Sequence, residues 1–297
     1  DETVEYIQKF THRGPVITRY KQTDEVISMH WTGNAYSNEI GAVFGLNVAE
    51  NWDDFKEAVE GFKAISQNFA YADTKGNIGM YTCAGVPVRK TTGWQVFPGD
   101  TTAYDWDAFV PFDSLPHSYN PPRGFVYSAN NRIVGDDYPY YISYWYDLPY
   151  RAGRIRSVLA EKGQVTVEDF KRLQTDHYGV FAEEFAPQLV QFLEEDLENL
   201  SETGKKGLKL LQNWDYKLDA ASSAALVFEK TVNRLLRKIF EDELGEELLE
   251  EYFAMDLLSN YVLDRMINGQ PSPWADDVRT TGHTETFSDM ARLAYTE

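Results

Sequence analysis

The sequence predicts an α+β protein in which strands and loops come first and helices follow. Up to about residue 150, short runs of alternating apolar and polar residues are separated by turns and by loops rich in Pro and Gly. From about Tyr150 the apolar residues recur at helical spacing instead. No obvious linker divides the chain, so we expect one functional unit with a sheet-and-loop portion over residues 1–160 and a mainly helical portion over residues 161–297.

The elements of the first portion follow from local patterns. Alternating runs predict strands over residues 3–10, 14–20 and 26–33, and a hairpin over residues 69–82 whose turn is formed by residues 74–77. Asn51 is a good N-cap for the one clear helix of this portion, in which Phe55 and Val59 recur at helical spacing. A further strand is expected over residues 124–129, directly before Asn130 and Asn131.

The helical portion has a clear start signal and four long amphipathic stretches. A helix is expected to start near Arg154, and Thr166 with Asp169 forms a capping signature for the next one. The amphipathic stretches cover residues 181–197, 204–214, 221–244 and 255–267, and a loop and a final helix follow residue 272.

Composition excludes several classes of function. The formal net charge is −19, which would repel a nucleic-acid backbone, so no nucleic-acid partner is expected. No apolar run approaches the roughly 20 residues that span a bilayer, so no membrane partner is expected either. The single cysteine, Cys83, lies in an apolar run and is expected to be a small buried hydrophobe.

Familiar catalytic motifs are missing from the sequence. The five histidines are scattered without metal-ligand spacing, which predicts no zinc site and no cofactor, and neither a G-x-S-x-G motif nor a Gly-rich phosphate loop occurs. What remains is the pair Asn130 and Asn131 and the nearby Arg151 and Arg154. Such an asparagine pair usually closes a turn, and such an arginine usually forms a surface ion pair, so residue chemistry alone names no nucleophile, acid or base.

A series of local phrases resembles the penicillin acylase family. They occur in this order: "HRGPVI", "GLNVAENWDDF", "QNFAYADTKGNIGMY", "GWQVFPGDTTAYDWDAFVPFDSLP", "NPPRGFVYSANNRIVGDDYPYY" and "PYRAGRI", followed by "SPWADDV" and "TETFSDMARLA". The resemblance covers nearly the whole chain and is tightest over residues 68–154. It implies the αββα fold of N-terminal-nucleophile hydrolases, which cleave their own precursors and attack N-acyl amide bonds with a serine at the new chain start. Penicillins, cephalosporins and acyl-homoserine lactones are the expected substrate types.

The resemblance also implies that the chain is part of a larger protein. It matches the large-subunit region downstream of the catalytic serine, and Asp1 has neither a hydroxyl nor a thiol to serve as the nucleophile. We therefore expect that the missing N-terminal segment of the same precursor is a partner, and that residues 1–297 are inactive alone. Relatives are exported, so a periplasmic or extracellular location is implied. Calcium is bound in many relatives, but Ile142, Ser143 and Trp145 occupy the places of an expected acidic ligand, so no complete metal site is predicted here.

Site residues are carried over from the family by position. Asn130 matches the asparagine that donates to the oxyanion, a role that suits a neutral NH₂ group because the charge develops only in the tetrahedral intermediate. Arg154 matches the arginine near the nucleophile, with Arg151 as the alternative. Substrate-binding positions map to Gln67 and to the neighbourhood of Val43 and Phe44.

A second hypothesis belongs to another class of function. Exposed tryptophans could hold a glycan or an aromatic ligand in a non-catalytic binding module. Trp94, Trp106 and Trp145 would then form the binding surface.

Overall fold

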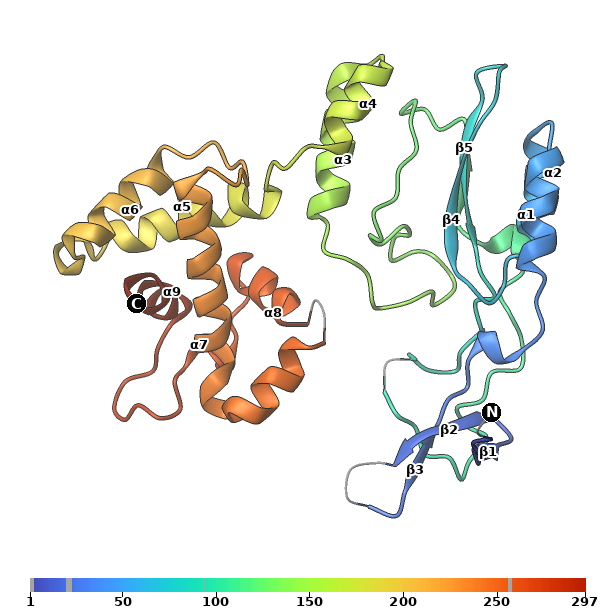
Figure 1. The fold of residues 1–297 in the computed structure, drawn as a ribbon, viewed down its shortest axis with the longest axis horizontal. Helices are drawn as coiled ribbons and strands as arrows, with labels where there is room; N and C mark the ends of the chain where they lie inside the picture. Colours follow the sequence, from blue (N-terminus) through green and yellow to red (C-terminus); the bar gives the residue numbers. More distant parts are fainter. Residues whose placement is uncertain (1–2, 20–22, 94, 256–257) are drawn as a thin grey trace. The chain divides into compact units, whose positions relative to one another are not determined.

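The computed structural model describes residues 3–19, 23–93, 95–255 and 258–297 (Figure 1). The protein has an α+β fold and divides into two compact units, Asp1–Tyr146 and Asp147–Glu297. The boundary expected from sequence, between residues 160 and 161, falls inside helix α3 (Tyr150–Lys162). The second unit begins earlier because α3 packs against α5 (Val180–Glu194), as the other helices of this unit pack against one another.

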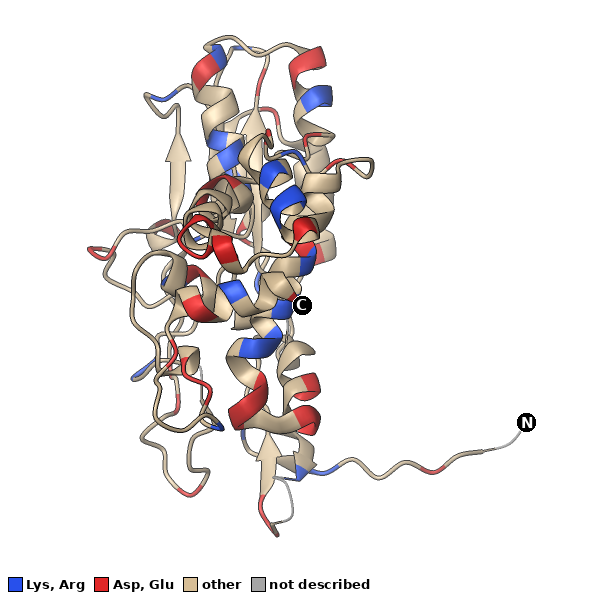
Figure 2. Ribbon diagram, turned by 90° about the vertical axis from the view of Figure 1, so that its left-hand side faces the viewer, with Lys and Arg blue, Asp and Glu red and all other residues tan. Residues whose placement is uncertain are grey.

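The first unit begins with an antiparallel sheet in the order β1 (Phe10–Thr11), β2 (Gly14–Arg19) and β3 (Val26–Ser28). The strand predicted over residues 3–10 is wrong for residues 3–9. Residues 3–7 run as an extended segment away from the sheet (Figure 2), whereas the Lys9 carbonyl still accepts from the Val16 backbone N–H at 2.8 Å. Alternation in sequence marks a backbone that can be extended, but a strand also needs a neighbouring strand for its ladder of hydrogen bonds.

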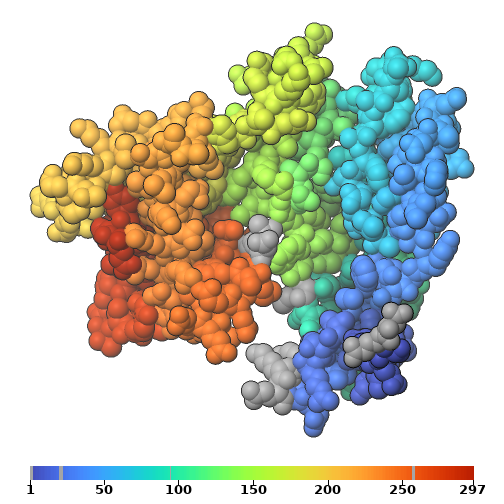
Figure 3. Space-filling model, in the orientation of Figure 1, coloured from blue at the N-terminus to red at the C-terminus, as the bar shows by residue number. Residues whose placement is uncertain are grey.

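A pair of helices follows, of which the sequence predicted only the second. They are α1 (Glu39–Val48) and α2 (Trp52–Val59), which lie at the surface of this unit in blue in Figure 3. Gly45 lowers the helix propensity of the α1 segment, so this helix was not predicted, yet the same glycine allows the two helices to approach each other closely. A Cβ atom on Gly45 would lie 3.0 Å from the Cβ atom of Ala58. The predicted cap of α2 is confirmed, because the Asn51 side chain accepts hydrogen bonds from the backbone N–H groups of Asp53 and Asp54.

The second sheet carries the expected hairpin. Strands β4 (Gln67–Ala72) and β5 (Ile78–Cys83) pair antiparallel, and β6 (His117–Tyr119) adds to β5. Short 3₁₀ helices form at Thr32–Asn34 and Phe112–Ser114. The core of this unit lies where α2 meets the sheet, and its buried residues are Phe55, Val59, Tyr81, Cys83, Val86, Val110 and Leu115.

The strand predicted over residues 124–129 is wrong. Within the described residues, this segment belongs to neither sheet. The contact between Ser128 and β4 is made by side chains, since the Asn68 Nδ2 atom donates to the Ser128 Oγ atom at 2.8 Å. The segment is therefore held against the sheet without joining its backbone ladder.

The second unit is built from helices, as the sequence predicted. Besides α3 and α5 it contains α4 (Val167–Gln174), α6 (Glu202–Gln212), α7 (Ser223–Phe253), α8 (Leu258–Ile267) and α9 (Phe287–Thr296), with short 3₁₀ helices at Leu197–Asn199 and Pro273–Ala275. The capping signature of Thr166 and Asp169 is confirmed. Helix α7 is interrupted at Gly245, whose φ of 67° lies in the left-handed region that glycine tolerates.

Apolar residues from α5, α6, α7, α8 and α9 form the core of the second unit. Phe185, Phe228 and Leu235 are fully buried in it. Asp and Glu alternate with Lys and Arg along many of the exposed helix faces (Figure 2). No described helix is both long and apolar enough to cross a membrane.

Candidate active site

The two asparagines after residue 129 have different structural roles. Asn131 closes the turn, because its Oδ1 atom accepts from the Ala129 backbone N–H at 3.1 Å and its Nδ2 atom donates to the Arg132 carbonyl at 2.8 Å. Asn130 is exposed and has a φ of 61°. Asparagine is one of the few residues other than glycine that adopts this left-handed region readily. The turn therefore uses the side chain of Asn131 and the backbone of Asn130, and leaves the Asn130 side chain exposed.

The turn is anchored to the second sheet through a chain of side-chain hydrogen bonds. The Thr82 Oγ1 atom donates to the Asn68 Oδ1 atom at 2.6 Å, and the Asn68 Nδ2 atom donates to Ser128. Thr82 on β5 is buried, and Asn68 on β4 is its partner in the ladder. Ala129, the next residue after Ser128, is also buried. These contacts hold the residues directly before Asn130 at a defined place on β4.

The predicted substrate-binding residues lie on the surface of the first unit. Gln67 is the first residue of β4 and is exposed, next in sequence to Asn68. Val43 and Phe44 lie on α1, with exposed fractions of 48% and 69%. The structure thus connects Gln67 to the Asn130 turn through Asn68, whereas Val43 and Phe44 are not part of that chain of hydrogen bonds.

Arg154 is held more firmly than Arg151. The guanidinium of Arg154 bonds to the Asp176 Oδ2 atom at 2.7 Å, and its Cζ atom lies 4.4 Å from the ring centroid of Tyr178. The second oxygen of Asp176 accepts from the Tyr178 backbone N–H at 2.9 Å, which fixes the carboxylate. Arg151 pairs with Asp147, and its side chain is 60% exposed. Both arginines belong to the second unit, whereas Asn130 belongs to the first.

Burial determines the ionisation of the groups around these residues. Burial, together with a hydrogen bond to Glu183, raises the pKa of Tyr178 to about 12, so the ring facing Arg154 is a neutral phenol at physiological pH. Burial likewise raises the pKa of the Cys83 thiol to about 12. Cys83 is fully buried as expected, and a thiol of that pKa does not serve as a nucleophile.

Asp73 explains the sequence phrase "YADTKGNIG" in structural terms. Its side chain accepts from the backbone N–H groups of Lys75 and Asn77, from the Asn77 amide and from the Tyr71 hydroxyl. These bonds, led by the one from the Asn77 side chain, lower the pKa of Asp73 to about 2. Asp73 is therefore a permanently ionised residue that shapes the β4–β5 turn.

No metal site emerges from the part of the chain that the structure describes. It contains no group of three or more His, Cys, Asp or Glu side chains arranged to hold a metal ion. We derive no catalytic step through a metal ion.

Of the three tryptophans of the second hypothesis, the structure describes Trp106 and Trp145, and the ring of each contacts other aromatic rings. Trp106 is stacked on His30 with 3.8 Å between ring centroids and also contacts Phe109. Trp145 is 39% exposed and lies edge-on to Tyr144. Trp94 lies outside the described residues.

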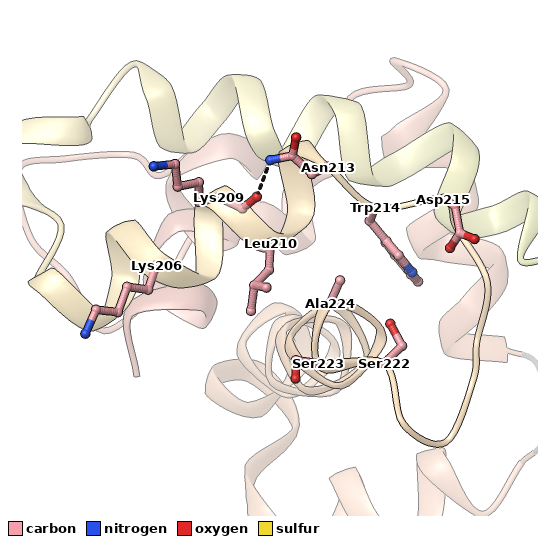
Figure 4. A pocket seen from close by; sticks show the side chains of 9 residues that line it. All are labelled: Lys206, Lys209, Leu210, Asn213, Trp214, Asp215, Ser222, Ser223 and Ala224. Carbon is pink, nitrogen blue, oxygen red and sulfur yellow. Dashed lines mark hydrogen bonds between the residues drawn. The ribbon is translucent and has the colours of Figure 1, made fainter.

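A wide groove of about 760 Å³ lies on the second unit between α6 and the start of α7. Lys206 and Lys209 extend outward from α6, while Leu210 and Trp214 point toward the start of α7 (Figure 4). The Trp214 Nε1 atom already donates to the Lys217 carbonyl at 3.0 Å. The groove lining contains no pairing of a nucleophile with a base, so it is not a candidate catalytic centre.

Sequence reasoning missed the residues that hold the site residues in place. These are Asn68, Thr82 and Ser128 around the turn, and Asp176 and Tyr178 around Arg154. A polar Asn68 directly before the apolar run "FAYA" is the one signal that could have pointed to the first group.

Comparison with known proteins identifies the family. The sequence model described as penicillin amidase matches residues 1–297. The chain belongs to the penicillin amidase family. Among curated relatives, it is 28% identical over 267 residues to the acyl-homoserine lactone acylase QuiP of Pseudomonas fluorescens. The aligned region covers 85% of this chain and 33% of QuiP. The chain is 30% identical over 203 residues to the penicillin acylase 2 proenzyme of Pseudomonas sp. strain SE83, covering 67% of this chain and 25% of the proenzyme.

A solved structure shares the fold. The thermostable penicillin G acylase from Alcaligenes faecalis matches 97% of this chain and 56% of its own, with a TM-score of 0.67 and 21% identity. The expected penicillin acylase fold is thereby confirmed. The chain spans about a third of the length of the first curated relative, QuiP from Pseudomonas fluorescens.

Proposed function

We propose that residues 1–297 are part of an amidohydrolase that cleaves N-acyl amide bonds. Relatives named as penicillin acylase and as acyl-homoserine lactone acylase support this reaction class. The proposed substrates are N-acyl compounds of the penicillin, cephalosporin or acyl-homoserine lactone type. The nucleophile would be an N-terminal serine that lies upstream of residue 1 in the precursor, with its own α-amino group as the base. On this placement, residues 1–297 alone do not hydrolyse the substrate.

In this proposal Asn130 donates from its carboxamide to the oxyanion. The observation that carries the role is the anchored turn, in which Asn131 and the Asn68–Ser128 bond fix the backbone on both sides of an exposed Asn130 side chain. A donor that is fixed before the reaction stabilises the developing charge without reorganising. Arg154, held by Asp176 and Tyr178, would lie near the serine and keep its α-amino group unprotonated.

The substrate contacts of the proposal involve Gln67, Val43 and Phe44. Val43 and Phe44 present an apolar surface on α1, which suits an acyl chain, and polar Gln67 would shift the preference away from a purely apolar group. Turnover of a panel of N-acyl-homoserine lactones of increasing acyl length, with penicillin G beside them, would define the preference. We also propose a periplasmic or extracellular location, which cell fractionation of the native host would test.

Substitution of Asn130 tests the function directly. In the full-length, processed protein, Asn130→Ala is expected to lower kcat by roughly 10²–10³ and to leave KM almost unchanged, because the donor acts mainly in the transition state. Asn130→Asp should be at least as damaging, since it keeps the shape and replaces the donor with an acceptor. Steady-state kinetics on the best substrate of the panel would measure both effects.

Asn199→Ala is the matched control, because Asn199 is an exposed asparagine on the second unit. It should keep wild-type kcat. A kcat for Asn130→Ala within a few-fold of wild type would remove the oxyanion role. A full-length protein that is never cleaved ahead of a serine and has no amidase activity would remove the proposed function itself.

A further inference from the structure

A second cavity, of about 340 Å³, lies within the first unit. Its walls are Ile17 of β2, strand β3 with the two residues that follow it, and parts of the loops over residues 89–93, 95–99 and 104–106. None of the residues proposed above for catalysis or substrate binding lines it. Its volume falls in the range of pockets that take small organic ligands.

The cavity wall is mixed, and one part of it is aromatic and aliphatic. Phe97 and Tyr104 stack with 4.5 Å between their ring centroids, and Trp106 is stacked on His30. Ile17 and Val26 add aliphatic surface from the strands. Walls of this kind favour a flat or branched apolar group.

Two arginines line the cavity, and of these only Arg13 has hydrogen-bond acceptors among the described residues. The Arg13 Nε atom donates to the Asp105 carboxylate at 2.6 Å, and its Nη1 atom donates to the Gly99 carbonyl at 2.6 Å. Its Nη2 atom donates to the Thr101 carbonyl at 2.5 Å. The hydrogen-bonding capacity of Arg13 is therefore largely used within the protein.

Arg89 has no comparable partners. Its guanidinium lies 5.9 Å from the ring centroid of Tyr141, and no acceptor in the described ranges takes a hydrogen bond from it. The backbone of Gly93 covers it closely, since a Cβ atom at that position would lie 2.8 Å from the Arg89 Nε atom. Burial also lowers the pKa of the guanidinium, although it stays fully protonated at physiological pH.

A partly buried cation without an acceptor costs folding free energy, because it has lost water and gained no compensating hydrogen bond. Arginine at such a place binds a carboxylate well, since its planar fork matches both oxygens. We infer that this cavity binds a small monocarboxylate with a flat apolar body, with the carboxylate on Arg89 and the body against Phe97, Tyr104 and Trp106.

Indole-3-acetate is a suitable probe, and indole-3-acetamide is its neutral match. Titration calorimetry on the full-length protein should show saturable binding of the carboxylate and binding of the amide that is roughly 10- to 100-fold weaker, the loss expected for a hydrogen bond to a charged group. Arg89→Met should remove this preference. Arg234→Met, a change of an exposed arginine on α7 of the second unit, should keep it.

Stability gives an independent readout. Arg89→Met is expected to keep or raise the melting temperature without ligand, because it removes an uncompensated cation and keeps the apolar stem. It should also abolish the rise in melting temperature that the carboxylate gives the wild-type protein. Absence of carboxylate binding by the wild type, equal affinity for the amide, or an unchanged preference in Arg89→Met would each overturn the inference.

Discussion

Asn68 connects β4, β5 and the loop that leads to Asn130. It is an acceptor for the buried Thr82 hydroxyl and a donor to Ser128, so a single side chain satisfies one polar group of the sheet and one of the loop. Its amide has a separate acceptor oxygen and donor nitrogen, whereas an ionised carboxylate of similar size could only accept. We propose that Asn68 is a positioning residue, which acts on the Asn130 turn through Ser128.

Breaking the contact at Ser128 should separate positioning from stability. In the full-length protein, Ser128→Ala is expected to lower kcat about tenfold with a small loss of stability, because the Asn68–Thr82 bond remains. Thr82→Val should lower the free energy of unfolding by about 1–3 kcal/mol, since it leaves a polar partner unmatched, and should change kcat less. Kinetics and urea denaturation of both variants would check this. A kcat for Ser128→Ala equal to that of wild type would contradict the positioning role.

At the scale of the element, α2 shows how the local sequence determines a helix start. The Asn51 Oδ1 atom accepts from Asp53 N–H at 2.9 Å and from Asp54 N–H at 3.1 Å, and the Asn51 amide donates to the Asp54 carboxylate at 2.9 Å. The buried face of α2, with Phe55 and Val59, then packs on the sheet that carries Asn68. The cap therefore stabilises an element on which the position of β4 depends.

Removal of the cap has a defined cost. Asn51→Ala should lower the free energy of unfolding by about 1 kcal/mol, whereas Asn51→Asp should retain most of it, because an aspartate oxygen also accepts from the first-turn N–H groups. Urea denaturation followed by circular dichroism would measure both changes. Equal stability of Asn51→Ala and wild type would show that packing alone determines the start of α2.

At the scale of the whole molecule, the excess of acidic groups makes stability depend on pH. Near the kink of α7, Glu243 is exposed as a residue, but partial desolvation of its carboxyl group and then a hydrogen bond with Asp242 raise its pKa from the ordinary value of 4.5 to about 7. The Oδ1 atom of Asp242 is buried and accepts no hydrogen bond from another described residue. Two ionised carboxylates cannot hydrogen-bond to each other, so the bond between Glu243 and Asp242 requires a proton on one of them.

The raised pKa of Glu243 determines the direction in which the stability of the protein changes with pH. Between about pH 4.5 and 7 the folded protein holds a proton on Glu243 that the unfolded chain has released, so the contribution of this group is full at low pH and is lost as the pH rises. Glu243→Gln, which imitates the neutral acid, should be more stable than wild type at about pH 8 and equal to it at about pH 4. Thermal denaturation across this range would check it.

Removal of any acidic group from a protein with a net charge of −19 relieves some repulsion. Glu247→Gln controls for that effect, since Glu247 is an exposed acid on the same helix. Its stability difference from wild type at about pH 8 should be smaller than that of Glu243→Gln. Equal differences for the two variants would assign the effect to net charge alone.

Local sequence predicted the elements whose signals are complete within one segment. The caps at Asn51 and Thr166, the β4–β5 hairpin, the burial of Cys83 and the helices of the second unit are all of this kind. Helix α1 was not predicted, because its glycines lower the helix propensity of the segment. They allow close packing against α2, a tertiary contact that local sequence patterns do not show.

The sequence by itself determined the α+β layout and, through its ordered phrases, the family. Tertiary structure alone decided that residues 124–129 do not form a strand, that Asn131 makes the turn while Asn130 is exposed, and that Asp176 and Tyr178 hold Arg154. It also decided that Arg89 is partly buried and has no hydrogen-bond acceptor in the part of the chain that the structure describes. The physical reason is the same in each case. Hydrogen bonds and burial depend on which residues far apart in the sequence come into contact, and the sequence of a single segment does not show which residues those are.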